Sequence, residues 1–272
     1  RWILSRHNAL IETATELMES HQYGEAGRHI YEFLWGEYAD WYIELAKPRL
    51  NSPDPHQRSA VQSVLLFVLE RALRLLHPFM PFVTEAAWQH LPHTGQALMI
   101  ARWPEAGGRD PEAESSMQLI MDAIRAIRNA RSEFNVEPAR RIPALVAAGQ
   151  QQALFESMRD SLVQLAHLDP AQLTINADLA DKPTQALALL VGSVEIYLPL
   201  SGMLDLAVEQ TRLRKELGQL QAQLARSQQI LANPAFLSRA PAEVVEKERA
   251  KLSGMQKQID KLTQRLALLQ AR

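Results

Sequence analysis

No cysteine occurs among the 272 residues of the chain, so a disulfide framework and a zinc site with thiolate ligands are excluded. No apolar run approaches the roughly 20 residues that a bilayer-spanning helix needs. The N-terminus also lacks the charged start, apolar middle and small-residue cleavage site of a secretory signal. These absences predict a soluble protein of the cytoplasm that does not bind a membrane.

Recognisable catalytic motifs are missing as well. The 11 glycines form no G-x-G phosphate loop, and no serine or histidine lies in a known nucleophile motif. His90 and His93 are the only close pair of histidines, and no further ligand lies at a credible spacing to complete a metal site. We therefore predict no catalytic residue and no metal site in this chain.

Charge is unevenly distributed along the chain, although its net value is only -2. Residues 204–272 hold 12 Lys and Arg against 7 Asp and Glu, whereas residues 1–203 hold 17 against 24. A basic tail on an acidic body favours a polyanionic partner. Solvated lysines and arginines on ordinary helix surfaces are the alternative.

Apolar residues recur at helical spacing over most of residues 1–137, which predicts an antiparallel helical bundle. The predicted helices cover residues 1–20, 27–45, 56–77, 85–90 and 112–134, with a break at Pro48. The chain begins at Arg1, inside the first apolar pattern and without an initiator methionine. We therefore expect a piece of a longer protein.

A small α/β module is expected over residues 138–201, because the composition changes at Pro138. Strands are predicted over residues 142–147, over 173–175 and on both sides of Gly192-Ser193, and a helix over 151–166. A two-residue turn that begins with glycine suits a type II′ hairpin.

Apolar residues in the last segment, 202–272, recur alternately three and four residues apart, as in a coiled coil. One seam runs over residues 206–231 and a second over 245–269, with two prolines between them. The pattern predicts a long antiparallel two-helix hairpin with arms about 43 Å long. Its register pairs Leu231 with Val245, Leu224 with Leu252 and Leu217 with Ile259.

Four stretches of the first part resemble the anticodon-binding bundle of class I aminoacyl-tRNA synthetases for branched aliphatic amino acids. They are RWILSR at 1–6, YADWYIELAK at 38–47, LHPFMPFVTE at 76–85 and IRAIRNAR at 124–131. The tail is similar to the valyl-tRNA synthetase family, through PLSGMLD at 199–205, NPxF at 233–236 and APxxVVxKER at 240–249. His7 departs from that pattern, because the family tends to have an apolar residue there.

The resemblance implies that the complete enzyme, a monomer, activates valine with ATP and Mg²⁺ and joins it to tRNA. The His-Ile-Gly-His and Lys-Met-Ser-Lys-Ser signatures of that chemistry occur nowhere in this chain. We therefore expect the chain to bind no cofactor and to be inactive alone. Its implied role is recognition of tRNA for valine, in which the bundle binds the anticodon loop and the hairpin binds the outer corner.

Candidates for the anticodon contact follow each other at i, i+3, i+4 and i+7 and share one helix face: Arg125, Arg128, Asn129 and Ser132. Arginine bridges phosphates and stacks on bases, whereas an amide pairs well with adenine. Valine anticodons have adenine in the centre, so Asn129 is the candidate for a base contact. A solvated face is the alternative, since residues 1–140 hold 14 basic against 18 acidic residues.

Candidates for the tRNA corner are Arg212, Lys215, Arg226, Phe236, Arg239, Lys247, Lys257 and Lys261. Apart from Phe236 and Arg239, near the tip of the hairpin, they occupy heptad positions c and f, which point away from the partner helix. The side chain of Phe236 caps the hairpin or meets an unstacked base.

Two alternatives remain open at this stage. A coiled-coil adaptor or structural protein without a nucleic-acid role competes with tRNA recognition, because heptads show only that helices pair. The aromatic run from Tyr31 to Tyr42 is either a base-stacking platform or, as this spacing favours, part of a packed core.

Overall fold

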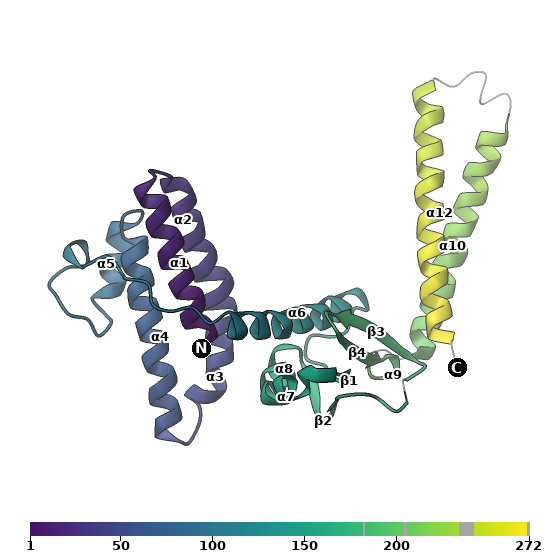
Figure 1. Ribbon diagram of the computed structural model, residues 1–272. Helices are drawn as coiled ribbons and strands as arrows, with labels where there is room; N and C mark the ends of the chain where they lie inside the picture. Colours follow the sequence, from purple (N-terminus) through teal and green to yellow (C-terminus); the bar gives the residue numbers. More distant parts are fainter. Residues whose placement is uncertain (182, 204–205, 234–241, 271–272) are drawn as a thin grey trace. The chain divides into compact units, whose positions relative to one another are not determined.

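The computed structural model describes residues 1–272 except 182, 204–205, 234–241 and 271–272. The chain forms two compact units, residues 1–121 and 122–272, and helix α6 (Pro111–Glu133) runs through the boundary. Most residues are helical, and one small four-stranded sheet lies in the second unit (Figure 1). The predicted mainly α class is thus confirmed. None of the helices described is both long and apolar enough to cross a membrane.

The first unit is a helical bundle. Its elements are α1 (Trp2–Glu19), α2 (Tyr23–Glu32), π-helix η1 (Phe33–Ile43), α3 (Glu44–Leu50), α4 (Pro55–Leu76), α5 (Pro81–Trp88), 3-10 helix η2 (Leu98–Ile100) and the start of α6. Helix α1 packs against both α2 and α4. Ile3, Ile11, Ile30 and Leu75 are fully buried, because the apolar stripes of the helices face the core. Trp88 is fully buried in a separate cluster with Leu73 and Leu98.

The helix predicted over residues 27–45 differs from expectation in two ways. Residues Phe33–Ile43 form the π-helix η1, which is continuous with α2 before it and α3 after it. A π-helix of this length is rare, and the apolar period that predicted an α-helix does not distinguish the two. Pro48, the predicted break, lies inside α3. Its missing N–H weakens the helix, which ends at Leu50.

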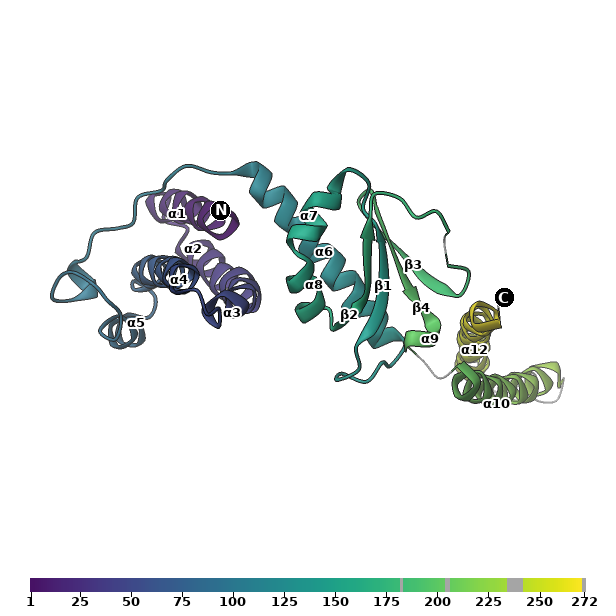
Figure 2. The ribbon, with the colours of Figure 1, turned by 90° about the horizontal axis from the view of Figure 1, so that it is seen from below.

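The sheet of the second unit has the strand order β2-β1-β4-β3. Strand β1 (Ile142–Ala147) is parallel to β2 (Leu168–Asn176) and antiparallel to β4 (Val194–Pro199), and β4 is antiparallel to β3 (Ala186–Val191). Helices α7 (Gln152–Ser157) and α8 (Arg159–Leu165) connect β1 to β2 and lie on one face of the sheet (Figure 2). A short helix, α9 (Leu200–Met203), follows β4.

Within this module the predicted hairpin is confirmed. Val191 pairs with Val194, and of the two turn residues only Gly192 has a positive φ, 58°, as a type II′ turn requires. Two other boundaries differ. The helix predicted over 151–166 is divided at Met158 into α7 and α8. Strand β2 is longer than residues 173–175 and pairs with β1 across a register shift, since it contains Pro170.

Helices α10 (Leu206–Ala232) and α12 (Ala242–Gln270) lie side by side and antiparallel (Figure 1). Among the described side chains of α12, all those that are not exposed lie at predicted seam positions. In α10 the same is true, except that Glu216 is also partly buried although it is not a seam position. Buried Ser227 donates a 2.7 Å hydrogen bond to Glu248, which lowers the pKa of that carboxyl. This contact lies between two layers of the predicted register, 231 with 245 and 224 with 252.

Candidate nucleic-acid interface

The four predicted anticodon residues lie on one exposed face of α6. Arg125, Arg128, Asn129 and Ser132 are all exposed. The opposite side of the helix is buried and carries Ile120, Ile124 and Ile127. The helical period therefore brings these polar side chains together as the spacing predicted.

Two of the four residues, Arg125 and Arg128, contact other residues of the protein. Arg128 Nε donates a 2.7 Å hydrogen bond to the carbonyl of Leu165, the last residue of α8. Arg125 forms a 3.0 Å ion pair with Asp122, where exposure keeps the stabilisation small. The side chains of Asn129 and Ser132 make no hydrogen bond within the described residues. The amide and the hydroxyl are thus the groups of this face that are available to a ligand.

Arg131, which is not among the residues predicted from the sequence, is the most buried charged residue of α6. Only 7% of it is exposed, and its guanidinium donates to the carbonyl oxygens of Glu137, Pro138, Arg140 and His167. Desolvation lowers its pKa from the usual value. A signal was present in the sequence: Arg131 follows Ile124 and Ile127 at i+7 and i+4, so it occupies the apolar stripe of the helix.

On the paired helices, the predicted cations are all exposed: Arg212, Lys215, Arg226, Lys247, Lys257 and Lys261. Arg212 lies 3.5 Å from Glu216 in an ion pair. The other five form neither a hydrogen bond nor an ion pair with any residue that the structure describes. Phe236 and Arg239 lie outside the described residues.

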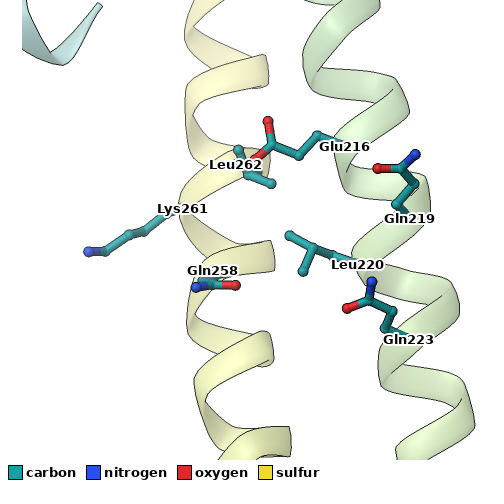
Figure 3. A pocket seen from close by; sticks show the side chains of 7 residues that line it. All are labelled: Glu216, Gln219, Leu220, Gln223, Gln258, Lys261 and Leu262. Atoms are coloured by element: carbon teal, nitrogen blue, oxygen red, sulfur yellow. The ribbon is translucent and has the colours of Figure 1, made fainter.

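A groove runs along the side of these two helices (Figure 3). It is lined by Glu216, Gln219, Leu220, Gln223, Gln258, Lys261 and Leu262. Figure 3 shows the side chain of Lys261 directed away from α10, as its outward heptad position predicted. Glutamine amides donate to phosphate and sugar oxygens without reading sequence, so this surface suits contacts to an RNA backbone.

The remaining aromatic and histidine candidates are mostly structural. Phe33, Tyr38 and Trp41 are buried, and burial raises the pKa of Tyr38 to about 12. Tyr31 and Trp35 are exposed, with ring centroids 6.2 Å apart. The aromatic run is therefore core in one part and surface in another.

His90 and His93 each contact a backbone carbonyl. The Nδ1 atoms of His90 and His93 lie 2.8 Å from the carbonyl oxygens of Ala86 and Leu91, and His93 stacks on Trp88. No group of three or more potential metal ligands occurs in the part of the chain that the structure describes.

Comparison with known proteins gives two family matches. Residues 1–146 match the model described as the anticodon-binding domain of tRNA ligase, and residues 205–270 match the valyl tRNA synthetase tRNA binding arm. The first match contains α1 to α6, including the exposed face of α6. The second contains the paired helices and all the exposed cations named above.

Similarity to complete proteins extends over the whole chain. It is 42% identical over 271 residues to a valine-tRNA ligase of Carboxydothermus hydrogenoformans and 39% identical over 272 residues to one of Bacillus cereus. Both alignments cover 99% of this chain, which spans 30% and 31% of these two relatives. The chain therefore belongs to the family of tRNA-ligase anticodon-binding domains.

Proposed function

We propose that this chain recognises tRNA for valine as the C-terminal part of a valine-tRNA ligase. The observation that carries the proposal is the presence of an anticodon-binding domain and a tRNA-binding arm in one chain. The complete enzyme, acting as a monomer in the cytoplasm, would supply valine activation with ATP and Mg²⁺. This chain contributes binding and positioning of the tRNA and has no aminoacylation activity of its own.

The exposed face of α6 serves the anticodon loop in this proposal. Bases in a loop are unstacked, so their edges are accessible to amide and hydroxyl groups. Asn129 has an amide without a partner among the described residues and pairs with the central adenine. Arg125 and Arg128 are exposed beside it and provide positive charge for the neighbouring phosphates.

The paired helices serve the outer corner of the tRNA. We propose that α10 and α12 form an antiparallel coiled coil, whose polar layer of Ser227 and Glu248 keeps the register. A fixed register holds the c and f positions on the outside, where five lysines and arginines have no partner among the residues described. Each phosphate that they neutralise adds a salt-sensitive increment to the affinity.

The alternative, a coiled-coil adaptor without a nucleic-acid role, is not favoured. Such a protein needs neither an anticodon-binding domain nor a tRNA-binding arm, and both are matched here. The domain boundaries at 137 and 201 remain predictions, as do the individual tRNA contacts.

Binding of transcribed tRNA for valine, compared with another tRNA of equal length, tests the proposal. We expect tighter binding of tRNA for valine, and we expect Asn129→Ala to weaken only that complex, by about 1 to 3 kcal/mol. Ser115→Ala, at another exposed position of α6, is the matched control. Equal affinity of the natural chain for both tRNAs would contradict specific recognition of tRNA for valine. If Asn129→Ala weakens binding of both tRNAs equally, Asn129 does not contact a base of the anticodon.

A further inference from the structure

The C-terminal end of α6 forms a pocket that shares only Ser132 with the proposed anticodon face. The helix ends in a Schellman motif: Val136 N donates to the carbonyl of Arg131, and Asn135 N donates to that of Ser132. Asn135 adopts the left-handed conformation that this motif requires, with φ 52°. The pocket next to this end is lined by Arg131, Ser132, Asn135, Val136, Glu137, Pro138 and His167.

Positive charge at this pocket is not neutralised by its structural contacts. Arg131 donates only to backbone carbonyls, and no carboxylate in the described part of the chain forms an ion pair with it. An arginine stays protonated even when burial lowers its pKa, so a full charge remains beneath the pocket. Carbonyl dipoles satisfy its N–H groups without cancelling that charge.

Three further arginines surround the same segment. Arg128 and Arg141 donate to the carbonyls of Leu165 and Leu168, 2.7 and 3.0 Å away, on either side of His167. Arg140 is exposed, and its carbonyl accepts from Arg131. After burial, the charges of Arg131, Arg141 and Arg128 are what lower the pKa of His167. Residues 128–141 hold four arginines against Glu133 and Glu137, so the cations are in excess.

Of the polar side chains that line the pocket, Glu137 carries a carboxylate, Ser132 also lies on the proposed anticodon face, and Asn135 and His167 have no role in the proposed function. Ser132, Asn135 and His167 are exposed and make no side-chain hydrogen bond with the residues that the structure describes. A hydroxyl, an amide and an imidazole are donors that phosphate oxygens accept. Cations around a set of unpaired donors are what a backbone phosphate requires.

We infer that this pocket, formed by α6 and the segment around His167, binds a backbone phosphate of the tRNA. It is thus a third contact, separate from the base contact of Asn129 and from the paired helices. The inference rests on the proposed tRNA binding. It gives the region between the two family matches, residues 147–204, a function: its segment from Leu165 to Leu168 holds the arginines in place.

An Asn135→Asp substitution in the whole chain tests the inference. Aspartate has the same shape and also tolerates the left-handed conformation, but it adds a negative charge to the pocket. Gln150→Glu makes the same change of charge at an exposed position outside the pocket and is the matched control. Helix content by circular dichroism verifies that both variants are folded.

Affinity for transcribed tRNA for valine is measured across a salt series. Loss of one phosphate contact lowers the salt slope by roughly 0.7 to 0.9 and weakens binding at about 0.1 M salt by roughly sixfold. We expect this change for Asn135→Asp and not for Gln150→Glu. Ethylation of individual tRNA phosphates identifies the phosphate that is bound. We expect one phosphate whose ethylation weakens binding to the natural sequence but does not weaken binding to Asn135→Asp.

Three outcomes overturn the inference. If Asn135→Asp binds tRNA with the affinity and salt slope of the natural sequence, the pocket does not bind a phosphate. If Gln150→Glu weakens binding equally, the loss reflects the overall charge of the chain. If the same phosphates are sensitive to ethylation in Asn135→Asp and in the natural sequence, the pocket makes no direct contact with a phosphate. Failure of the proposed function is distinguishable, because then the natural chain itself does not bind tRNA for valine more tightly than another tRNA.

Discussion

Replacing His7 with leucine removes a buried polar group that has no partner among the described residues. The imidazole is fully buried, neither ring nitrogen forms a hydrogen bond with any residue that the structure describes, and the rings of Phe33 and Phe67 lie next to it. Burial, with a smaller effect of Arg71, lowers its pKa to about 4 from the ordinary value of 6.5. The folded protein therefore holds His7 neutral over a pH range in which the unfolded chain binds a proton.

The sign of the pH effect follows from this difference. Between pH 6.5 and 4 the unfolded state binds the extra proton, so the free energy of unfolding falls as the pH falls. A shift from 6.5 to about 4 corresponds to a loss on the order of 3 kcal/mol at the low end of this range. A leucine of similar volume has no such loss, and it also removes unsatisfied polar atoms, which adds about 1 to 3 kcal/mol of stability.

Tryptophan fluorescence during urea unfolding measures this effect selectively. All five tryptophans (Trp2, Trp35, Trp41, Trp88 and Trp103) lie in the first unit. We expect the stability difference between His7→Leu and the natural sequence to grow by about 3 kcal/mol between pH 7 and pH 4. His56→Leu, at an exposed position, is the control for the loss of a histidine. A difference that is the same at both pH values would refute the argument.

Three further predictions concern other parts of the chain. Leu213→Asp places a carboxylate at a position where only 1% of the residue is exposed, so we expect α10 and α12 to unfold while the tryptophan fluorescence of the first unit is unchanged. Unfolding of the first unit together with α10 and α12 would contradict the division into separate units. Arg131→Met leaves the carbonyls of Pro138 and Arg140 without a donor among the described residues, since those of Glu137 and His167 still accept from backbone N–H groups. It should lower the stability of the second unit by about 2 to 4 kcal/mol in urea titrations followed by circular dichroism, whereas no loss would show that water replaces the guanidinium. The chain mixed with valine and ATP should show no pyrophosphate exchange, because the two nucleotide-binding signatures are absent, and exchange by a pure sample would contradict this expectation.

Local patterns predicted the regular parts of the fold. The alternation after Gly192-Ser193 predicted the β3–β4 hairpin, and the heptads predicted which side chains of α10 and α12 are sheltered. Both rest on short-range rules, a two-residue turn and a repeating apolar position. The π-helix η1 and the parallel pairing of β1 with β2 depend on tertiary packing, which the spacing of apolar residues does not encode.

Only the part of the candidate site that depends on local helical spacing could be predicted from the sequence. Helical spacing suffices to place Asn129 and Ser132 on one exposed face. It does not reveal that Arg128 binds the end of α8, nor that Arg131 joins the residues after α6 to His167, because those partners are 36 or 37 residues away in the sequence. Long-range polar contacts of this kind require the structure.

Salt-dependent binding by a hairpin variant tests the central claim, recognition of tRNA by this chain, most directly. Arg226, Lys247 and Lys257 are exposed, and their replacement with glutamine leaves the seam and the helix propensity intact. The control replaces Arg28, Lys47 and Arg159, which already pair with carboxylates, so that the loss of charge is equal.

We expect the hairpin variant to bind tRNA for valine more weakly, with a salt slope that is lower by up to about 2 to 3, and to retain its preference over another tRNA. Natural affinity and slope in the hairpin variant, or equal losses in the control, would contradict the account.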